Sequence, residues 1–295
     1  MSDTALSRRE LLALLAASAA VPAVAADPPA RALLPVETPG LDHLDVMVPD
    51  VEKTTRFYMG LFRTTLHAQP FQGAQRYFVL LGPLPENRAV GYLAIGNSRG
   101  RGTYIGHFCT SVANWQRDSA TIFAQMKERF RGAGFGEFAG ATGVGGIFND
   151  PEGIEVQFLP TPDTLVTAAV PSDLVPGGQG LVTPLKVDHV VVHVADLDGA
   201  LAFYRLLYGR EQRRDRQRAT FAFRNGSRLE LEKTRYVYGA AKSRIARYGI
   251  RVEPFDRAKV EAGIAALGGT VSRGDDRKAL RLTDGDGIEL ELVSG

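Results

Sequence analysis

The stretch LDHLDVMVPDVEKTTRFYMGLF, residues 41–62, recurs as VDHVVVHVADLDGALAFYRLLY, residues 187–208, at an offset of 146 positions. At this single offset His43 matches His189, Asp50 matches Asp196, and a Phe-Tyr pair matches a Phe-Tyr pair. An alignment of this length without a gap indicates an internal duplication, and a recurring unit defines the size of a domain. We therefore expect two domains of the same fold.

Each copy of the stretch has the pattern of a strand followed by a helix. Side chains alternate between the two faces of a strand, so one face of the first copy is purely aliphatic, with Leu44, Val46 and Val48. The opposite face is expected to carry Leu41, His43, Asp45 and Met47. Asp50 stands where a helix N-cap belongs, and apolar residues recur at helical spacing after it. The aliphatic face is expected to pack in a hydrophobic core, and the other face is expected to carry the functional side chains.

Short alternating runs follow each predicted helix and are separated by Gly, Pro, Asn or Ser, which favour turns between strands. The unit is therefore βαβββ. A second strand–helix–strands pattern begins at Ile105 in the first half and at Ala246 in the second half. The sequence thus predicts an α+β protein with four βαβββ modules in two domains.

This order of motifs resembles the vicinal oxygen chelate superfamily, which includes glyoxalase I, bleomycin-resistance proteins and extradiol dioxygenases. The resemblance rests on the Asp-His strand, the Phe-Tyr helix, and the closing turns DPEG at 150–153 and DGDG at 284–287. It implies that each domain joins two βαβββ modules into one curved mixed sheet, shaped like a cup. It also implies a first domain at 41–161 and a second at 186–295, joined by a Pro- and Gly-rich linker at 162–185.

Residues 1–30 have the layout of an export signal. Arg8 and Arg9 precede the apolar run LLALLAASAAVPAVAA, and the paired arginines resemble the twin-arginine type. The run is shorter than the roughly 20 residues that a membrane-spanning helix needs. We expect cleavage of this segment, a periplasmic mature protein and no stable membrane insertion. An uncleaved membrane anchor and a disordered leader are the alternatives.

Composition and net charge limit the kinds of partner that the protein is expected to bind. The net charge is +2, and acidic residues interrupt the densest basic run, GREQRRDRQRA from Gly209, so we expect no nucleic-acid partner. A single cysteine, Cys109, excludes an intramolecular disulfide. With 44% hydrophobic residues, the chain can support two cores, one in each domain. Exposed strand edges are compatible with a homodimer.

The resemblance also implies metal ligands on the first, fourth, fifth and eighth strands of a domain. In the first domain these positions hold His43, Ala94, His107 and Gln157, of which Ala94 cannot bind a metal. Glu155 lies on the same strand face as Gln157 and could supply a carboxylate instead. Two imidazoles with one carboxylate leave coordination positions open, which favours Fe(II) or Mn(II) over Zn or Ni.

In the second domain the same four positions hold His189, Glu230, Arg247 and Glu291. An arginine repels a nearby cation, so a metal is not expected there. Arg247 is expected to form an ion pair with Glu230 and Glu291, or to anchor a substrate carboxylate. His193, on the same face as His189, is a spare ligand candidate.

Two functions of different class follow. The first is an exported metal-dependent enzyme, dioxygenase-like or glyoxalase-like, that chelates two neighbouring oxygens of a small oxygenated substrate, for which an aromatic compound is one candidate. The second is a metal-free protein that sequesters a small molecule, like the bleomycin-resistance proteins. The catalytic residues stay open, with Tyr92 and Tyr104 as candidate proton donors. The segment between Phe108 and Leu185 has no histidine, and Phe148 stands near the tyrosine position of extradiol enzymes, which argues against ordinary catechol cleavage.

Overall fold

The computed structural model describes residues 34, 36–71, 73–82, 91–135, 141–142, 145–160, 169–175, 180–235, 244–272 and 278–295. All of them belong to one compact unit, Leu33–Gly295. The expected export signal at 1–30 and parts of the expected linker lie outside the described residues. Within the described ranges, no helix has the length and apolar character needed to cross a membrane.

The first half of the chain folds into one mixed sheet, whose described strands follow the order β2-β3-β4-β1-β5-β8-β7-β6. The central strand β1 is parallel to β4 and antiparallel to β5. The elements are β1 (Leu41–Val48), α2 (Val51–Leu61), β2 (Leu66–Phe71), β3 (Ala74–Leu80), β4 (Tyr92–Asn97), β5 (Tyr104–Val112), α3 (Trp115–Gly132), β6 (Ala141–Thr142), β7 (Gly145–Asn149) and β8 (Glu155–Pro160). Two βαβββ modules therefore share a single sheet, as predicted.

The second half repeats this plan with the strand order β10-β11-β12-β9-β13-β16-β15-β14 among the described residues. A 3₁₀ turn, η1 (Ser172–Leu174), precedes it. The elements are β9 (Thr183–Val194), α4 (Leu197–Tyr208), β10 (Arg213–Arg214), β11 (Arg218–Ala222), β12 (Arg228–Lys233), β13 (Ile245–Glu253), α5 (Arg257–Ala266), β14 (Thr270–Val271), β15 (Ala279–Thr283) and β16 (Glu289–Ser294). Strand β9 begins inside the span expected as linker, because Thr183 and Pro184 already pair with β13.

The predicted alternation along β1 is confirmed for the aliphatic row, since Leu44, Val46 and Val48 are buried in the hydrophobic core. Leu41 was expected on the face of His43, but it also lies in this core. The pairing of β1 with β5 shifts register between Leu41 and Leu44, so β1 contains one extra residue there. Such a bulge reverses the facing of the residues that precede it.

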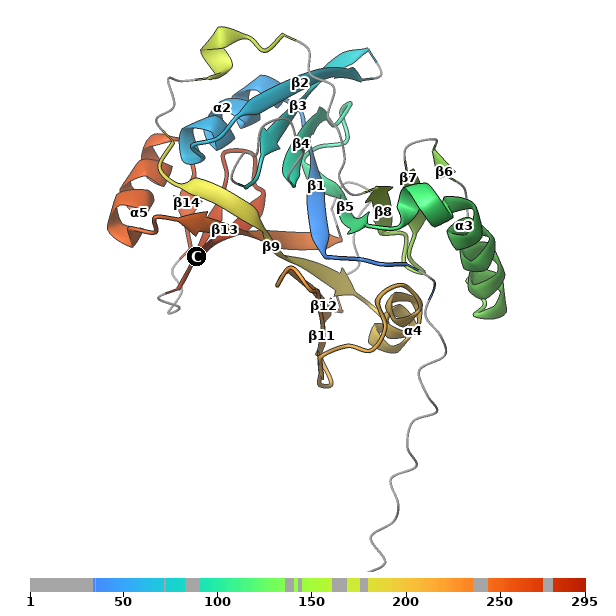
Figure 1. Cartoon of the computed structure of the whole chain (residues 1–295). Coiled ribbons are helices and arrows are strands. Elements are labelled where there is room, and N and C mark those ends of the chain that lie inside the picture. Colours follow the sequence, from blue (N-terminus) through green and yellow to red (C-terminus); the bar gives the residue numbers. More distant parts are fainter. Residues whose placement is uncertain are drawn as a thin grey trace, which may run out of the picture. The chain divides into compact units, whose positions relative to one another are not determined.

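The two halves share one hydrophobic core, which corrects the expectation of a separate core in each domain. Strand β1 lies against β9, and β5 lies against β13. A single continuous cluster of buried side chains draws from both sheets and from the helices of both halves. Figure 1 shows α2 beside α5, and α3 beside α4, so each helix of the first half has a neighbour from the second half. The ring centroids of Phe130 on α3 and Phe203 on α4 are 5.2 Å apart.

The repeated motifs meet across the boundary between the halves. The Tyr204 hydroxyl of the second Phe-Tyr helix donates to Asp150 of the first closing turn, at 3.1 Å. The Tyr58 hydroxyl of the first helix donates to Asp284 of the second closing turn, at 2.9 Å. The other carboxylate oxygen of each aspartate accepts backbone N–H groups of its own turn. The motifs therefore join the two halves as well as close each sheet.

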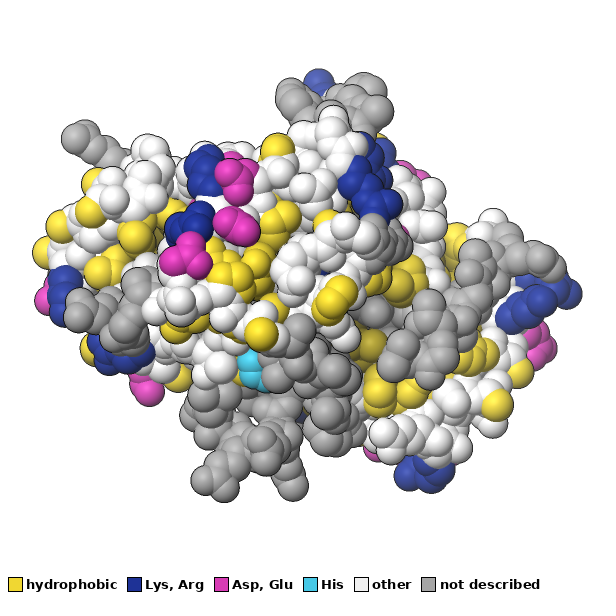
Figure 2. All heavy atoms as spheres, turned by 90° about the horizontal axis from the view of Figure 1, so that it is seen from above, with side chains coloured by type: hydrophobic (Ala, Val, Ile, Leu, Met, Phe, Trp, Pro, Cys, Tyr) yellow, Lys and Arg dark blue, Asp and Glu magenta, His cyan; other side chains and the backbone are white. Residues whose placement is uncertain are grey.

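Charged side chains of both signs lie in small groups on the face of the molecule shown in Figure 2, among neutral and apolar side chains. This distribution agrees with the small net charge of +2.

Candidate metal centre

Strand β5 carries a bulge beside the two predicted histidine ligands of the first sheet. Asp45 pairs with His107, but Val46 already pairs with Ile105, so Gly106 is the extra residue of β5. Bulges locally turn side chains and are frequent beside functional sites. A methyl group on Gly106 would lie 3.0 Å from a carboxylate oxygen of Asp45, so glycine allows this close approach.

Three donor atoms converge on the first sheet. The Nε2 atom of His43 lies 3.3 Å from Nε2 of His107 and 2.9 Å from Oε1 of Gln157. Donor atoms about 2.1 Å from one metal ion lie about 3.0 Å apart in an octahedron and about 3.4 Å apart in a tetrahedron. The two observed separations match this range. These side chains come from β1, β5 and β8, which are adjacent in the sheet.

Carboxylates contact the opposite ring nitrogen of each histidine. Asp42 Oδ1 lies 2.9 Å from Nδ1 of His43. Nδ1 of His107 lies 3.3 Å from Glu155 Oε1 and 3.5 Å from Asp45 Oδ2. A metal-binding imidazole typically donates its other N–H to a carboxylate in this way. Glu155, predicted as an alternative ligand, thus lies on the outer side of His107, whereas Gln157 lies on the inner side of His43.

These outer contacts determine where the lone pairs point. An imidazole that donates from Nδ1 to a carboxylate carries a lone pair on Nε2. The Nε2 lone pairs of His43 and His107 then face each other, and the lone pairs of the Gln157 carbonyl oxygen face that of His43. Acceptors at such short range repel one another unless a cation lies among them. The donor set therefore fits a bound divalent metal.

Burial keeps His43 in the form that can bind a metal. Removal from water lowers the pKa of this imidazole, although the hydrogen bond to Asp42 acts in the opposite direction. The Tyr92 ring stacks on the His43 ring, with centroids 4.2 Å apart and planes at 13°. Tyr92 also packs with Phe78, Leu80 and Ala94 in a separate apolar cluster. Ala94, at the fourth-strand ligand position, thus contributes an apolar contact beside the site.

Sequence reasoning missed Asp42 and Cys109. One donor atom of each lies within 4.8 Å of a His43 nitrogen, and Cys109 is fully buried. The signal for Asp42 was available, because the Asp-His pair recurs as Asp188-His189. Cys109 follows His107 by two residues on β5, but nothing else in the sequence distinguishes it.

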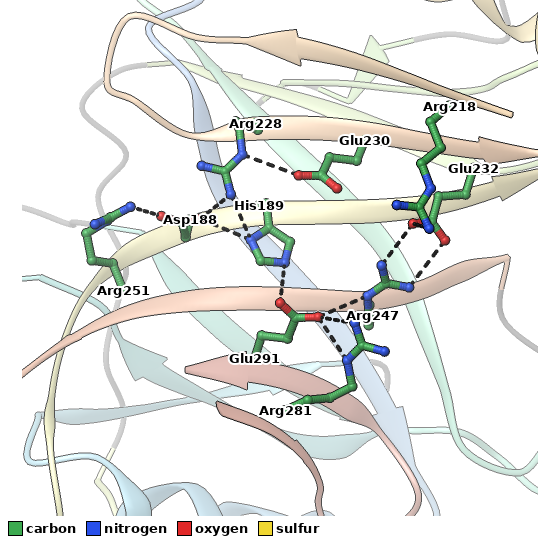
Figure 3. A network of polar contacts seen from close by, with 10 residues as sticks. All are labelled: Asp188, His189, Arg218, Arg228, Glu230, Glu232, Arg247, Arg251, Arg281 and Glu291. Carbon is green, nitrogen blue, oxygen red and sulfur yellow. Dashed lines mark hydrogen bonds and ion pairs between the residues drawn. The ribbon is translucent and has the colours of Figure 1, made fainter. Parts of the chain in front are cut away.

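The corresponding site in the second sheet is an ion-pair network (Figure 3). Nδ1 of His189 lies 3.0 Å from Asp188, as in the first sheet, but its Nε2 lies 3.5 Å from a carboxylate oxygen of Glu291. Arg247 bonds Glu291 at 3.2 Å, as predicted, and Glu232 at 3.0 Å. Glu230, also predicted beside Arg247, does not bond it directly. Burial alone would lower the pKa of Arg247, but the charge of Glu230 helps to raise it, together with the closer Glu232 and Glu291. Glu230 instead contacts Arg228, which lies two residues earlier on the same face of β12.

Asp188 connects three strands of the second sheet. Its carboxylate bonds Arg228 of β12 and Arg251 of β13, in addition to His189 of β9. Burial alone would raise the pKa of Asp188, but the hydrogen bond to His189 and the two guanidinium charges lower it to about 2. His193, the spare ligand candidate, lies 3.4 Å from Glu232. The carboxylates that could attract a metal in the second sheet are thus paired with arginines.

No protein-family model matches the chain, and no curated protein does. Several solved structures match the fold of the chain. The 2,3-dioxygenase LapB from Pseudomonas sp. KL28 superposes with a TM-score of 0.61 and 12% sequence identity, over 86% of this chain and 91% of that chain. The Mn(II)-bound glyoxalase from Novosphingobium aromaticivorans gives a TM-score of 0.61 and 12% identity, over 88% and 83%. Homoprotocatechuate 2,3-dioxygenase from Arthrobacter globiformis gives 0.60 and 16%, over 90% and 83%.

The chain has the same fold as these dioxygenases and this glyoxalase, as its resemblance to the vicinal oxygen chelate superfamily implied. The predicted class, α+β with two tandem sheets of this type, is therefore confirmed. Within this vicinal oxygen chelate fold, Phe148 is buried in the shared core, and its ring contacts Phe130, Phe158 and Phe203. The side chain of Phe148 therefore packs in the core.

Proposed function

We propose that this chain is a metal-dependent enzyme whose first sheet binds one divalent metal through His43, His107 and Gln157. The convergence of their three donor atoms at 3.3 and 2.9 Å is the observation that carries the proposal. The solved structures with the same fold include a glyoxalase that is described as Mn(II)-bound. Fe(II) or Mn(II) is the favoured ion, because two imidazoles and one oxygen donor leave coordination positions open.

When bound, the metal would supply a Lewis acid able to hold two neighbouring oxygens of a small substrate. The protein residues have separate tasks. Asp42 and Glu155 hold the histidine rings through Nδ1, so both Nε2 atoms stay oriented inward. Tyr92 and Phe78 form an apolar wall beside His43 and exclude water on that side. The substrate class is a small oxygenated molecule.

Metal content of the purified protein tests this function. Protein prepared without chelators should carry about one equivalent of metal, and a His43→Ala, His107→Ala variant should lose it. His189→Ala is the matched control, because His189 occupies the same repeat position in the second sheet, and this variant should keep the metal. Circular dichroism establishes that each variant is folded.

The opposite outcome favours the alternative function. If wild-type protein is metal-free after supply of Fe(II), Mn(II), Zn and Ni, the enzyme proposal fails. Metal-free protein that still binds small aromatic molecules would be a sequestering protein of the bleomycin-resistance type. The replacement of a carboxylate by the amide of Gln157 is the feature that favours this alternative, because an amide brings no negative charge to the site.

We also propose that the mature protein is exported to the periplasm by the twin-arginine route. The support is the Arg8-Arg9 pair followed by an apolar run. Expression of the full chain should give a periplasmic product that lacks residues 1–25 or so, as mass spectrometry of the intact protein would reveal. Replacing both arginines by lysine should retain the uncleaved protein in the cytoplasm. Cleavage and export that continue unchanged in this variant would exclude the twin-arginine route.

A further inference from the structure

A small pocket of about 100 Å³ lies at the end of β1 and β4, next to the candidate metal centre. Three arginines line it, together with one carboxylate. The lining residues that matter here are Asp45, Phe71, Gln75, Arg76, Arg99 and Arg101. Among the described lining residues, guanidinium groups outnumber carboxylates three to one.

Two donors at the pocket are buried without a partner. Within the described part of the chain, neither Nε of Arg76 nor Nε2 of Gln75 has a hydrogen-bond acceptor. Leaving a buried donor unsatisfied costs free energy, more so when the group is charged. An anionic group in the pocket would supply the missing acceptors once these two side chains turn toward it.

The other two arginines come from the turn after β4. Arg99 has a positive φ of 53°, which is unusual for a residue with a side chain. Its backbone N–H donates to the Asn97 side chain at 2.8 Å, which stabilises this conformation. The Arg101 guanidinium lies over the Tyr104 ring, 5.0 Å from the centroid. The backbone at Arg99 and the side chain of Arg101 are thus positioned by specific local contacts.

Asp45 connects the pocket to the metal centre. One of its oxygens accepts a hydrogen bond from Arg76, and the other lies 3.5 Å from Nδ1 of His107. Asp45 follows His43 by two residues on β1, which corresponds to about 7 Å along the strand. Phe71, a residue that is 47% exposed, lines the same pocket, and the Arg76 guanidinium lies 5.0 Å from its ring centroid. A ligand as small as one aromatic ring could therefore reach both places.

We propose that this pocket binds a carboxylate group of the substrate, so that the substrate is a small aromatic or similarly apolar carboxylic acid. This inference rests on the proposed function, because the substrate is the molecule whose oxygens reach the metal. Guanidinium groups pair with planar carboxylates through two parallel hydrogen bonds. A doubly charged phosphate would be repelled more strongly than a carboxylate by Asp45, which lines the same pocket.

Calorimetric titration with matched probes tests the proposal. Benzoate and benzamide have nearly the same shape, but only benzoate is charged, and phenyl phosphate carries the alternative anion. Benzoate should bind about tenfold or more tightly than benzamide, and more tightly than phenyl phosphate. An Arg99→Gln, Arg101→Gln variant should lose this preference. Arg117→Gln, which removes an exposed arginine on α3, is the control and should retain it.

The titrations are repeated on protein freed of metal with a chelator, so that the two proposals can fail separately. A preference for benzoate in protein that never binds metal would leave the pocket assignment standing and exclude the metal enzyme. Equal binding of benzoate and benzamide by metal-loaded protein would exclude the carboxylate pocket and leave the metal centre standing. Tighter binding of phenyl phosphate, or an unchanged preference in the double variant, would also overturn the assignment.

Discussion

His43 and His189 occupy the same position of the repeat, and the groups that face their Nε2 atoms differ in charge. His43 faces His107 and Gln157, which bring no negative charge. His189 faces Glu291, a carboxylate that also bonds Arg247. A metal at His43 would meet lone pairs, whereas a metal at His189 would meet a carboxylate that already pairs with the guanidinium of Arg247. The divergence of the two halves therefore depends on the residues opposite each histidine.

Replacing Gln157 by glutamate should strengthen metal binding. The amide oxygen lies 2.9 Å from Nε2 of His43, so the new carboxylate would bring a negative charge directly to the proposed ion. Attraction between opposite charges at such a distance increases divalent-metal affinity by about tenfold or more. Competition with a chelating dye measures this change.

Glu155→Gln is the matched control for this prediction. Glu155 contacts the outer nitrogen of His107, so its loss should weaken metal binding less than replacement of His107 itself. Outer contacts of this kind typically contribute tenfold to a hundredfold to metal affinity. If Glu155→Gln removes the metal completely while Gln157→Glu changes nothing, then Glu155 is the ligand and the assignment of Gln157 is wrong.

Side-chain alternation was enough to predict that Glu155 and Gln157 share a face of their strand. It could not predict which of them would approach His43, because this depends on the register of β8 against β5, in which Glu155 pairs with His107 and Gln157 with Cys109. The family resemblance implied that His43 and His107 stand at the ligand positions of the first and fifth strands, and the structure brings their Nε2 atoms together. The second carboxylate at His107, that of Asp45, depends on the bulge at Gly106, for which the sequence pattern gave no signal.

At the scale of elements, Asp188 joins strands β9, β12 and β13, and its ionisation should make stability depend on pH. Its pKa is lowered to about 2 in the folded protein, against about 3.9 in an unfolded chain. The folded state therefore favours the ionised form, and this contribution is fully present above pH 4 or so. It is lost as the pH falls from about 4 to about 2, and it amounts to at most about 3 kcal/mol.

Urea unfolding at a series of acidic pH values measures this dependence. In Asp188→Asn the carboxylate is absent, so the free energy of unfolding should be lower at neutral pH and should fall less steeply between about pH 4 and pH 2. Asp198→Asn is a suitable control, because Asp198 is exposed and contacts Arg214 at the surface. An equal pH slope in wild type and Asp188→Asn would show that this carboxylate is not stabilised by folding.

Strand and helix positions were largely predictable from alternation, capping residues and turn residues. Both Asp50 and Asp196 cap their helices with side-chain hydrogen bonds, as their positions indicated. Irregular pairing was not predictable, because a bulge is a property of two strands and periodicity describes only one. Leu41 is the clearest example, since its own strand gives no sign of the register shift opposite β5.

At the scale of the molecule, the paired Tyr–Asp hydrogen bonds across the halves should contribute to stability. Tyr204→Phe removes the hydroxyl that donates to the buried Asp150 carboxylate. We expect a loss of about 1–3 kcal/mol in the free energy of unfolding, because a buried carboxylate loses a donor. Tyr58→Phe should act similarly through Asp284. Tyr104→Phe, at a partly buried tyrosine on β5, is the control and should change the free energy of unfolding by less. An equal loss in this control would mean that the Tyr–Asp hydrogen bonds between the halves contribute no more than the hydroxyl of another tyrosine.

The repeat predicted two similar sheets, but it could not predict that they share one core. Both sheets have an aliphatic face, and alternation does not tell whether that face meets its own helices or the other sheet. The matching of Tyr58 with Tyr204 and of Asp150 with Asp284 was visible in the sequence. Nothing in it indicated that each tyrosine contacts the aspartate of the opposite half.

The shared core predicts that the two halves unfold together. Trp115, the single tryptophan, is buried on α3 and reports on the first half, while hydrogen exchange of β13 and β16 reports on the second. Because β1 packs on β9 and β5 on β13, loss of either sheet exposes the apolar face of the other. Denaturant titrations followed by Trp115 fluorescence and by exchange in β13 should therefore give the same midpoint. Two separate midpoints, or a stable isolated fragment 180–295, would instead mean that each sheet can bury its apolar face without the other.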